Sequence, residues 1–205
     1  MWKRVKIISS LCLFVIQPIK AENYTGFYIG GGAGQATYDI SDRYFGSEGV
    51  DDSDKAFKLI AGYQFNDYLS LEGGYVDLGK LSYFSDVTLT NPEGEIFDIH
   101  MDGIVEIDGL IINIVGSYPI AEQFSIYTKV GMFSWEREAV HNSSSTHFEE
   151  RPTYYSVDRS GDGSDVFYGL GLSYNWNSFY FRVEYEKFKS DDDIDTFSLG
   201  AVYHF

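Results

Sequence analysis

Residues 197–205 read FSLGAVYHF. Large apolar or aromatic residues stand at the odd positions Phe197, Leu199, Tyr203 and Phe205, and most even positions carry small or polar residues. Successive side chains of a β-strand point to opposite faces, so this alternation predicts a strand with one apolar face.

The same alternation recurs along the chain and predicts seven more strands. The recognisable parts of the eight strands are residues 26–40, 55–65, 68–75, 109–118, 124–132, 166–175, 179–186 and 197–205. The predicted connections alternate in length. Those at Asn66, Pro119 and Asn175 are short, whereas the others are long and polar: 41–54, about 78–106, 137–164 and 189–195. The loops of about 78–106 and 137–164 are expected to carry strand extensions above the membrane. In the first of these two loops, Asp86 to Thr90 and Glu95 to His100 look like the two arms of a protruding hairpin around residues 91–94.

The composition favours a membrane protein built from strands. Aromatic residues make up 18% of the chain and there are 21 glycines. After residue 21 no stretch is apolar for the roughly 18 residues that a membrane helix needs. A membrane protein without such helices satisfies its backbone hydrogen bonds in a closed barrel. We therefore predict an all-β fold: an eight-stranded, antiparallel, up-and-down transmembrane β-barrel with long extracellular loops.

Aromatic residues gather at the ends of the predicted strands. A girdle at the short-turn interface is expected from Tyr63, Phe65, Tyr68, Tyr118, Phe124, Tyr174, Trp176, Tyr203 and Phe205. The opposite interface is assigned to Tyr38, Tyr44, Tyr75, Tyr83 and Tyr185.

The first 21 residues are predicted to be a signal peptide and residues 22–205 the barrel domain. Lys3, Arg4 and Lys6 precede a short apolar run, and Ala21 supplies a small residue at the cleavage site. A lipoprotein alternative at Cys12 fails because Leu11 is too large and the position lies inside the apolar run. Removing residues 1–21 leaves 11 basic against 31 acidic residues, so the formal charge changes from −16 to −20. Such acidity argues against a nucleic-acid partner and favours cationic partners.

Four stretches carry a resemblance to a known family. They are residues 61–64 with 71–75 (AGYQ and LEGGY), 116–120 (GSYPI), 126–131 (IYTKVG) and 181–185 (FRVEY). Together they resemble the transmembrane domain of outer membrane protein A and related small barrels. The resemblance implies a Gram-negative outer-membrane location, and it makes Tyr203 and Phe205 part of a C-terminal signal for the barrel assembly machinery. Larger relatives add a cell-wall-binding domain, and no such anchoring is expected here.

Strand parity places six charged residues in the barrel interior: Lys58, Glu72, Lys129, Arg182, Glu184 and Glu186. The first five of these are the candidate ion-pair network. Isolated charges in a narrow interior are costly, so we expect Arg182 to bridge Glu72 and the others to complete a network. The resemblance implies that such a cluster gates a small conductance. However, Val115 and Ser173 stand where the related family has charged partners. The alternative interpretation is that the polar side chains only fill the barrel interior.

Other groups offer weaker alternatives. Acidic runs at 51–54, 158–165 and 191–193 suit solvated loops or weak binding of divalent cations that bridge to lipopolysaccharide phosphates. His141, Ser143 and Glu149 resemble the residues of barrels that deacylate lipid A, but Ser144 departs from that pattern and a loop does not fix catalytic geometry. The histidines show no metal-ligand spacing.

These observations lead to one functional hypothesis and two alternatives. The chain is expected to be a monomeric, non-enzymatic outer-membrane protein, without cofactor or metal, that has a structural or surface-interaction role. Its expected partners are outer-membrane lipids and lipopolysaccharide, the assembly machinery and an extracellular ligand at the acidic loops. A narrow ion-conducting pore is the first alternative, and a lipid A-modifying enzyme is the remote one.

Overall fold

The computed structural model describes residues 25–39, 49–90, 96–147, 153–189 and 193–205. Within these ranges no helix has the length and apolar character needed to cross a membrane. The described chain is built from nine strands: β1 (Gly26–Asp39), β2 (Gly49–Asp51), β3 (Ser53–Asn66), β4 (Leu69–Thr90), β5 (Ile96–Pro119), β6 (Phe124–His147), β7 (Thr153–Trp176), β8 (Phe179–Phe188) and β9 (Asp193–His204). The predicted signal peptide lies outside the described residues.

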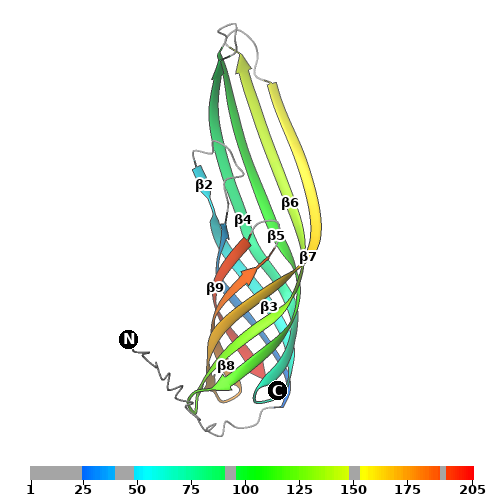
Figure 1. Ribbon diagram of the computed structural model, residues 1–205, viewed down its shortest axis with the longest axis vertical. Coiled ribbons are helices and arrows are strands. Elements are labelled where there is room, and N and C mark those ends of the chain that lie inside the picture. Colours follow the sequence, from blue (N-terminus) through cyan, green and yellow to red (C-terminus); the bar gives the residue numbers. More distant parts are fainter. Residues whose placement is uncertain (1–24, 40–48, 91–95, 148–152, 190–192) are drawn as a thin grey trace, which may run out of the picture.

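Eight of the strands close into a barrel (Figure 1). Each pairs antiparallel with its neighbour, from β3 through β4 to β9, and β1 joins β9 to β3. The short β2 lies outside this ring and pairs only with β4, where Gly49 faces Phe84. The predicted eight-stranded up-and-down barrel is therefore confirmed, with one added strand.

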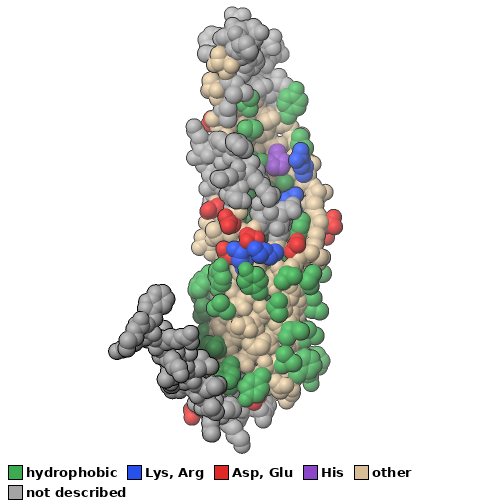
Figure 2. Space-filling model, in the orientation of Figure 1, with side chains coloured by type: hydrophobic (Ala, Val, Ile, Leu, Met, Phe, Trp, Pro, Cys, Tyr) green, Lys and Arg blue, Asp and Glu red, His purple; other side chains and the backbone are tan. Residues whose placement is uncertain are grey.

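The two faces of each strand differ in exposure as the alternation predicts. In β9, Phe197 and Leu199 are 57% and 60% exposed, whereas Ser198 and Val202 are buried. Ile29 on β1 likewise points outward. Figure 2 shows these apolar side chains as a band around the lower part of the molecule, below a belt of charged side chains. An outward-facing apolar band of this kind is the surface that an outer-membrane barrel presents to lipid.

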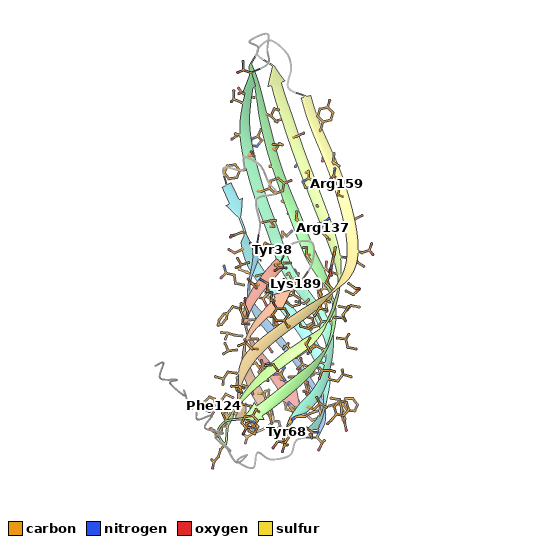
Figure 3. All side chains as sticks on the ribbon, in the orientation of Figure 1. Tyr38, Tyr68, Phe124, Arg137, Arg159 and Lys189 are labelled. Atoms are coloured by element: carbon orange, nitrogen blue, oxygen red, sulfur yellow. The ribbon has the colours of Figure 1, made fainter. Side chains whose placement is uncertain are left out.

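Aromatic residues crowd the short-turn end of the barrel. Rings pair there between neighbouring strands, as in Phe124 with Tyr174 and Phe179 with Tyr203. Tyr68 and Phe124 lie at this end in Figure 3. The turns themselves are short, and Asn177 adopts the left-handed conformation (φ 57°) that asparagine tolerates.

The aromatic set predicted for the opposite interface is wrong in part. Tyr75 and Tyr185 are exposed, but Tyr38 is only 2% exposed and its hydroxyl donates to the carbonyl oxygen of Leu78 inside the barrel. Tyr38 has the even numbering of the inward face of β1, and its burial follows from that parity. Tyr83 lies further along β4, where its hydroxyl contacts His141, and Tyr44 lies outside the described residues.

Two of the predicted long loops consist mostly of the expected strand extensions. Residues 78–106 and 137–164 belong almost entirely to β4, β5, β6 and β7, which continue beyond the barrel as a four-stranded sheet (Figure 1). We call this sheet the extension and define it as residues 80–90, 96–108, 136–147 and 153–164. The predicted hairpin is part of it, because Asp86 pairs with His100 and Thr90 with Ile96. Its turn, residues 91–95, is not described.

A β-bulge separates the barrel part of β4 from the extension. The β4–β5 register shifts between Asp77 and Lys80, and Gly79 has a φ of +75°. The Gly79 amide donates to Asp77 Oδ1 at 2.8 Å, and the Lys80 amide donates to Asp54 Oδ2 at 2.9 Å. A bond from the Lys55 amide and the bond from the Lys80 amide hold the pKa of Asp54 below its usual value. The bulge lets β4 bend out of the barrel wall.

Candidate functional site

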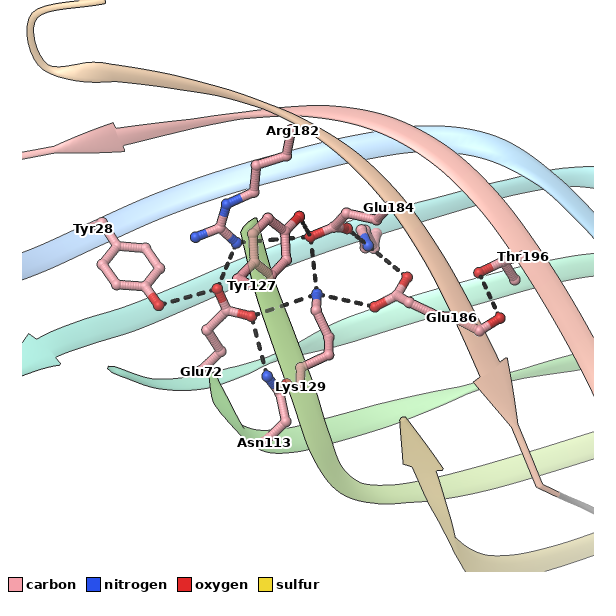
Figure 4. Close-up of polar contacts among 10 residues, drawn as sticks. Tyr28, Glu72, Asn113, Tyr127, Lys129, Arg182, Glu184, Glu186 and Thr196 are labelled. Carbon is pink, nitrogen blue, oxygen red and sulfur yellow. Dashed lines mark hydrogen bonds and ion pairs between the residues drawn. The ribbon is translucent and has the colours of Figure 1, made fainter. Parts of the chain in front are cut away.

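Six charged side chains meet inside the barrel, all of them on inward-facing positions (Figure 4). The five predicted residues are among them: Lys58 on β3, Glu72 on β4, Lys129 on β6, and Arg182 and Glu184 on β8. The structure adds Glu186, two positions beyond Glu184 on the same face of β8. We call these six residues the charge cluster.

Ion pairs join the charge cluster into one network. Arg182 reaches Glu72 at 2.6 Å, the pair expected from the sequence. The Lys129 amine lies 2.9 Å from Glu184 and 3.0 Å from Glu186, and 3.8 Å from Glu72. Lys58 contacts both Glu184 and Glu186, the latter at 2.6 Å. Each carboxylate therefore has at least two cationic neighbours.

Charge balance explains the place of Glu186 in the cluster. The five predicted residues comprise three cations and two carboxylates, which leaves an uncompensated positive charge in a buried space. Such a charge is costly, so a third carboxylate stabilises the cluster. Counting the charges on inward positions would have identified Glu186 from the sequence.

Neutral side chains complete the hydrogen bonds of the carboxylates. The Tyr28 hydroxyl donates to Glu72 at 3.0 Å, and the Tyr127 hydroxyl donates to Glu184 at 2.6 Å. Asn113 donates to Glu72 at 3.2 Å. The Arg182 guanidinium also lies 5.7 Å and 5.2 Å from the ring centres of Tyr28 and Tyr127. Sequence reasoning assigned no partner to these three polar residues because their roles depend on cross-strand register.

Val115 and Ser173 are the two positions where this chain lacks the charged residues of the related family. Val115 is 1% exposed, and Ser173 is buried and donates to the Ser125 carbonyl oxygen at 3.4 Å. A small cavity of about 50 Å³ opens toward the short-turn end on this side, lined by Ser173, Arg182 and His204 among others.

An apolar layer lies on the other side of the charge cluster, toward the extension. Phe133, Phe167 and Phe188 are each 0% exposed, and the ring centre of Phe188 lies 5.0 Å from both of the others. Leu78 and Ile194 are equally buried and belong to the same cluster. We call these five residues the aromatic plug. The interior thus contains a charged layer and an apolar layer in series.

The remaining sequence candidates do not come together into a second site. His141 and Ser143 lie on β6 rather than in a loop, and His141 Nδ1 contacts the Tyr83 hydroxyl. Glu149 lies outside the described residues. The acidic residues 158–165 lie on β7 and not in a loop. Among the described residues, no group of three His, Cys, Asp or Glu side chains is placed to hold a metal ion.

The two residues predicted to belong to the assembly signal lie at the C-terminal end of β9. Tyr203 and Phe205 are 38% and 73% exposed on the outer face, and their rings stack edge to face at 5.2 Å. The Phe205 amide donates to the Phe27 carbonyl oxygen, which ties the last residue to β1.

Comparison with known proteins agrees with this geometry. The chain is 24% identical over 193 residues to an outer membrane protein A of Yersinia pseudotuberculosis, covering 87% of this chain and 48% of that protein. It is 32% identical over 157 residues to outer membrane protein A of Serratia marcescens, covering 70% and 37%. The chain thus spans about half the length, or less, of these relatives.

A solved structure and a family model extend the comparison. The crystal structure of Ail, the attachment invasion locus protein of Yersinia pestis, in complex with the heparin analogue sucrose octasulfate, matches with a TM-score of 0.50. It is 21% identical and covers 88% of this chain and 99% of that one. The family model for the outer membrane protein beta-barrel domain matches residues 7–205. With its closed ring of strands, apolar outer band and charged interior, the chain belongs to the outer membrane protein β-barrel domain family.

Proposed function

We propose that this barrel anchors the extension in the outer membrane and presents it to partners outside the cell. The observation that carries the proposal is the continuation of β4, β5, β6 and β7 well beyond the apolar band (Figures 1 and 2). A barrel needs only about 10 residues per strand to cross the membrane, whereas β5, β6 and β7 have 24 residues each. The surplus builds an external surface.

The charge of the extension supports a role in binding. Its outward-facing positions include Glu106, Glu136, Glu138, Asp158 and Asp162. Such a surface attracts cationic groups and repels polyanions. The heparin analogue in the Yersinia pestis complex is polyanionic, a ligand class that the acidic surface of this chain repels.

The packing of the barrel interior favours a structural role over an ion-conducting pore. The charge cluster fills one layer with paired side chains, and the aromatic plug fills the next. An ion would have to break the first layer and lose its hydration in the second. We propose that both layers stabilise the barrel and that the protein is not an enzyme.

The further partners are proposed from the same surfaces. The apolar band suits the acyl chains of outer-membrane lipids and lipopolysaccharide. Tyr203 and Phe205 are proposed as the residues that the barrel assembly machinery recognises. A monomer is proposed because the ring of strands is closed by its own eight strands.

A trimmed barrel tests the proposal. Replacing residues 82–104 and 136–162 by short turns joins register partners, removes Glu136, Glu138, Asp158 and Asp162, and keeps the membrane part of every strand. We expect cells that carry the full chain to adhere to protein-coated surfaces and cells that carry the trimmed barrel not to adhere, with unchanged detergent resistance in both. Equal adhesion of full and trimmed barrels would contradict the proposal.

A further inference from the structure

The inner face of the extension is the surface on which its basic side chains gather. We define this face as the odd-numbered residues of the extension, which continue the inward positions of β5, β6 and β7 in the barrel. Every acidic side chain that the structure describes in the extension stands at an even position, on the outward face. Arg137, Arg159 and His141 stand at odd positions. Figure 2 shows basic side chains beside a histidine on this part of the molecule. The two faces of the sheet therefore differ in the sign of their charge.

The Arg137 side chain reaches across from β6 to β7. Arg137 is the register partner of Gly161, and a Cβ added to Gly161 would meet Arg137 Nη2 at 3.6 Å and Nε at 3.9 Å. The guanidinium thus lies over the glycine, as the Trp135 ring lies over Gly163. Arg159 is the next residue on the same face of β7, roughly 7 Å along the strand from Gly161. Two arginine side chains therefore occupy neighbouring places over β7, and Figure 3 labels them one above the other.

The two neighbouring cations point to an anionic ligand. Arg159 is exposed, and no hydrogen bond or ion pair joins it to another described residue. Like charges on adjacent strands destabilise a sheet, and an anion placed between them removes that cost. A guanidinium binds a carboxylate through two parallel hydrogen bonds, so the arginines can hold one such group between them. The next inward carboxylate along β7, Asp165, accepts a hydrogen bond from Trp135 Nε1 at 2.8 Å.

Apolar side chains continue the inner face of β7 beyond Arg159. Val157 and Tyr155 are the next two odd-numbered residues, and they are 48% and 65% exposed. The strand runs about 13 Å from Arg159 to Tyr155. Binding sites for small molecules combine an apolar surface with a few placed polar groups. This strip therefore suits a ligand that has a charged head and an apolar tail.

The ligand should carry few other polar groups. A polyanion needs a longer row of cations, and beyond this strip it meets the carboxylates of Asp158 and Asp162 on the outward side of β7. A polypeptide laid on the face would leave its own amide and carbonyl groups unpaired, because the backbone groups of a sheet point sideways within its plane. An alkyl chain has no such groups to satisfy.

We propose that the inner face of the extension binds a fatty-acid-like amphiphile. Its carboxylate lies between Arg137 and Arg159, and its alkyl chain lies along Val157 and Tyr155. The aromatic plug lies between this site and the charge cluster, so the ligand stays at the outer mouth of the barrel. This inference goes beyond the proposed surface role, which uses the acidic outward face.

The test uses the full folded chain in nanodiscs of a zwitterionic phospholipid. The probe is octanoate, and octanol and acetate are its controls, because each keeps one half of its chemistry. Nuclear magnetic resonance of isotope-labelled arginine and valine follows Arg137, Arg159 and Val157 during titration. Octanoate should shift the signals of all three residues along one saturation curve. Octanol should leave the arginine signals unchanged, and acetate should bind more weakly by about tenfold or more.

Matched variants separate this site from general attraction of anions. Arg159→Gln removes one charged partner of the carboxylate and should weaken octanoate binding about tenfold. Lys80→Gln is the control, because it changes the net charge equally but lies on the outward face, and it should leave octanoate binding unchanged. Val157→Ser should weaken octanoate binding several-fold, because it removes apolar surface under the alkyl chain.

Three results would overturn the proposal. These are the absence of saturable shifts with octanoate, equal shifts of the arginine signals with octanol, and an Arg159→Gln variant that folds and binds octanoate like the parent. Should Arg159→Gln fail to fold, the comparison of the three probes on the parent chain decides.

Discussion

Arg182 is the side chain with the most varied contacts in the charge cluster. It pairs with Glu72 at 2.6 Å, approaches Glu184 at 3.8 Å and lies against the rings of Tyr28 and Tyr127. Because Glu72 is almost completely buried, it has no solvent to replace a lost partner. The stability of the cluster therefore depends on its completeness more than on any one pair.

Truncation of Arg182 should destabilise the barrel strongly. We expect Arg182→Ala to lower the free energy of unfolding by about 3–5 kcal/mol, since it leaves a buried carboxylate short of its closest cation. Urea unfolding in detergent or lipid, followed by the mobility of the folded band on gels, measures the change. The double variant Glu72→Gln with Arg182→Met should lose less, and an equal or larger loss would show that charge pairing is not the cause.

His100 in the extension should titrate above an unpaired histidine. Its Nδ1 lies 2.5 Å from Asp86 Oδ1, and this bond and charge raise the pKa of His100, with a smaller contribution from Asp102. The raised pKa in the folded state means that protonation stabilises the β4–β5 hairpin at low pH, and that this is lost as pH rises through the folded pKa. Nuclear magnetic resonance titration of His100 should show a lower midpoint in Asp86→Asn, and an unchanged midpoint would refute the pairing.

Strand parity was enough to predict which residues face the interior, but not which of them touch. Lys58, Glu72, Lys129, Arg182 and Glu184 could be placed inward because side chains alternate along each strand. Their pairing depends on the cross-strand register, which the residue pattern of the individual strands does not predict. Glu186 faces inward by the same parity, and only a count of the inward charges indicates that it joins the network.

The strands show where small residues let large ones cross the interior. Tyr28 on β1 extends over Gly62 on β3, which is its direct partner in the register, and so reaches Glu72 on β4. Tyr127 on β6 lies over Gly171 on β7 in the same way. A glycine opposite a tyrosine thus positions the hydroxyl that completes the charge cluster.

A side chain added at Gly62 should disturb this arrangement. A Cβ there would overlap the Tyr28 ring, so Gly62→Ala should lower the free energy of unfolding by about 1–3 kcal/mol, as overpacking does. Gly73→Ala is the matched control, because its Cβ would meet only the Ile111 carbonyl oxygen, at 3.7 Å. Equal effects of the two substitutions in urea unfolding would refute the proposed role of Gly62.

The extension was predicted only in part, as strand extensions carried by two long loops. Residues 78–106 and 137–164 are rich in polar and charged side chains, and loops are the usual place for them. In the structure these segments are strands whose outward face meets water instead of lipid, so the apolar alternation that marks the barrel part is absent. The bulge at residues 77–80 also reverses the parity of β4, so Leu81 points inward where the barrel pattern places odd residues outward.

At the scale of the whole molecule, the charge cluster and the aromatic plug form two successive layers that block the interior of the barrel. We expect purified protein to show no conductance in planar bilayers, and Glu72→Ala with Arg182→Ala to remain closed because the aromatic plug is intact. Adding Phe133→Ala, Phe167→Ala and Phe188→Ala should open a pore, since both barriers are then removed. Conductance of the Glu72→Ala, Arg182→Ala variant alone would show that the charge cluster is the sole gate.

The central claim is that lipid contacts the odd-numbered side of β9 and that the even-numbered side faces the closed interior. Single cysteines at Phe197, Ser198, Leu199, Val202 and Tyr203, spin-labelled in bilayers, allow oxygen dissolved in the acyl chains to report contact with lipid. Collision rates should be high at Phe197, Leu199 and Tyr203 and low at Ser198 and Val202. Rates that do not alternate, or that are highest at the even positions, would contradict the membrane-spanning barrel.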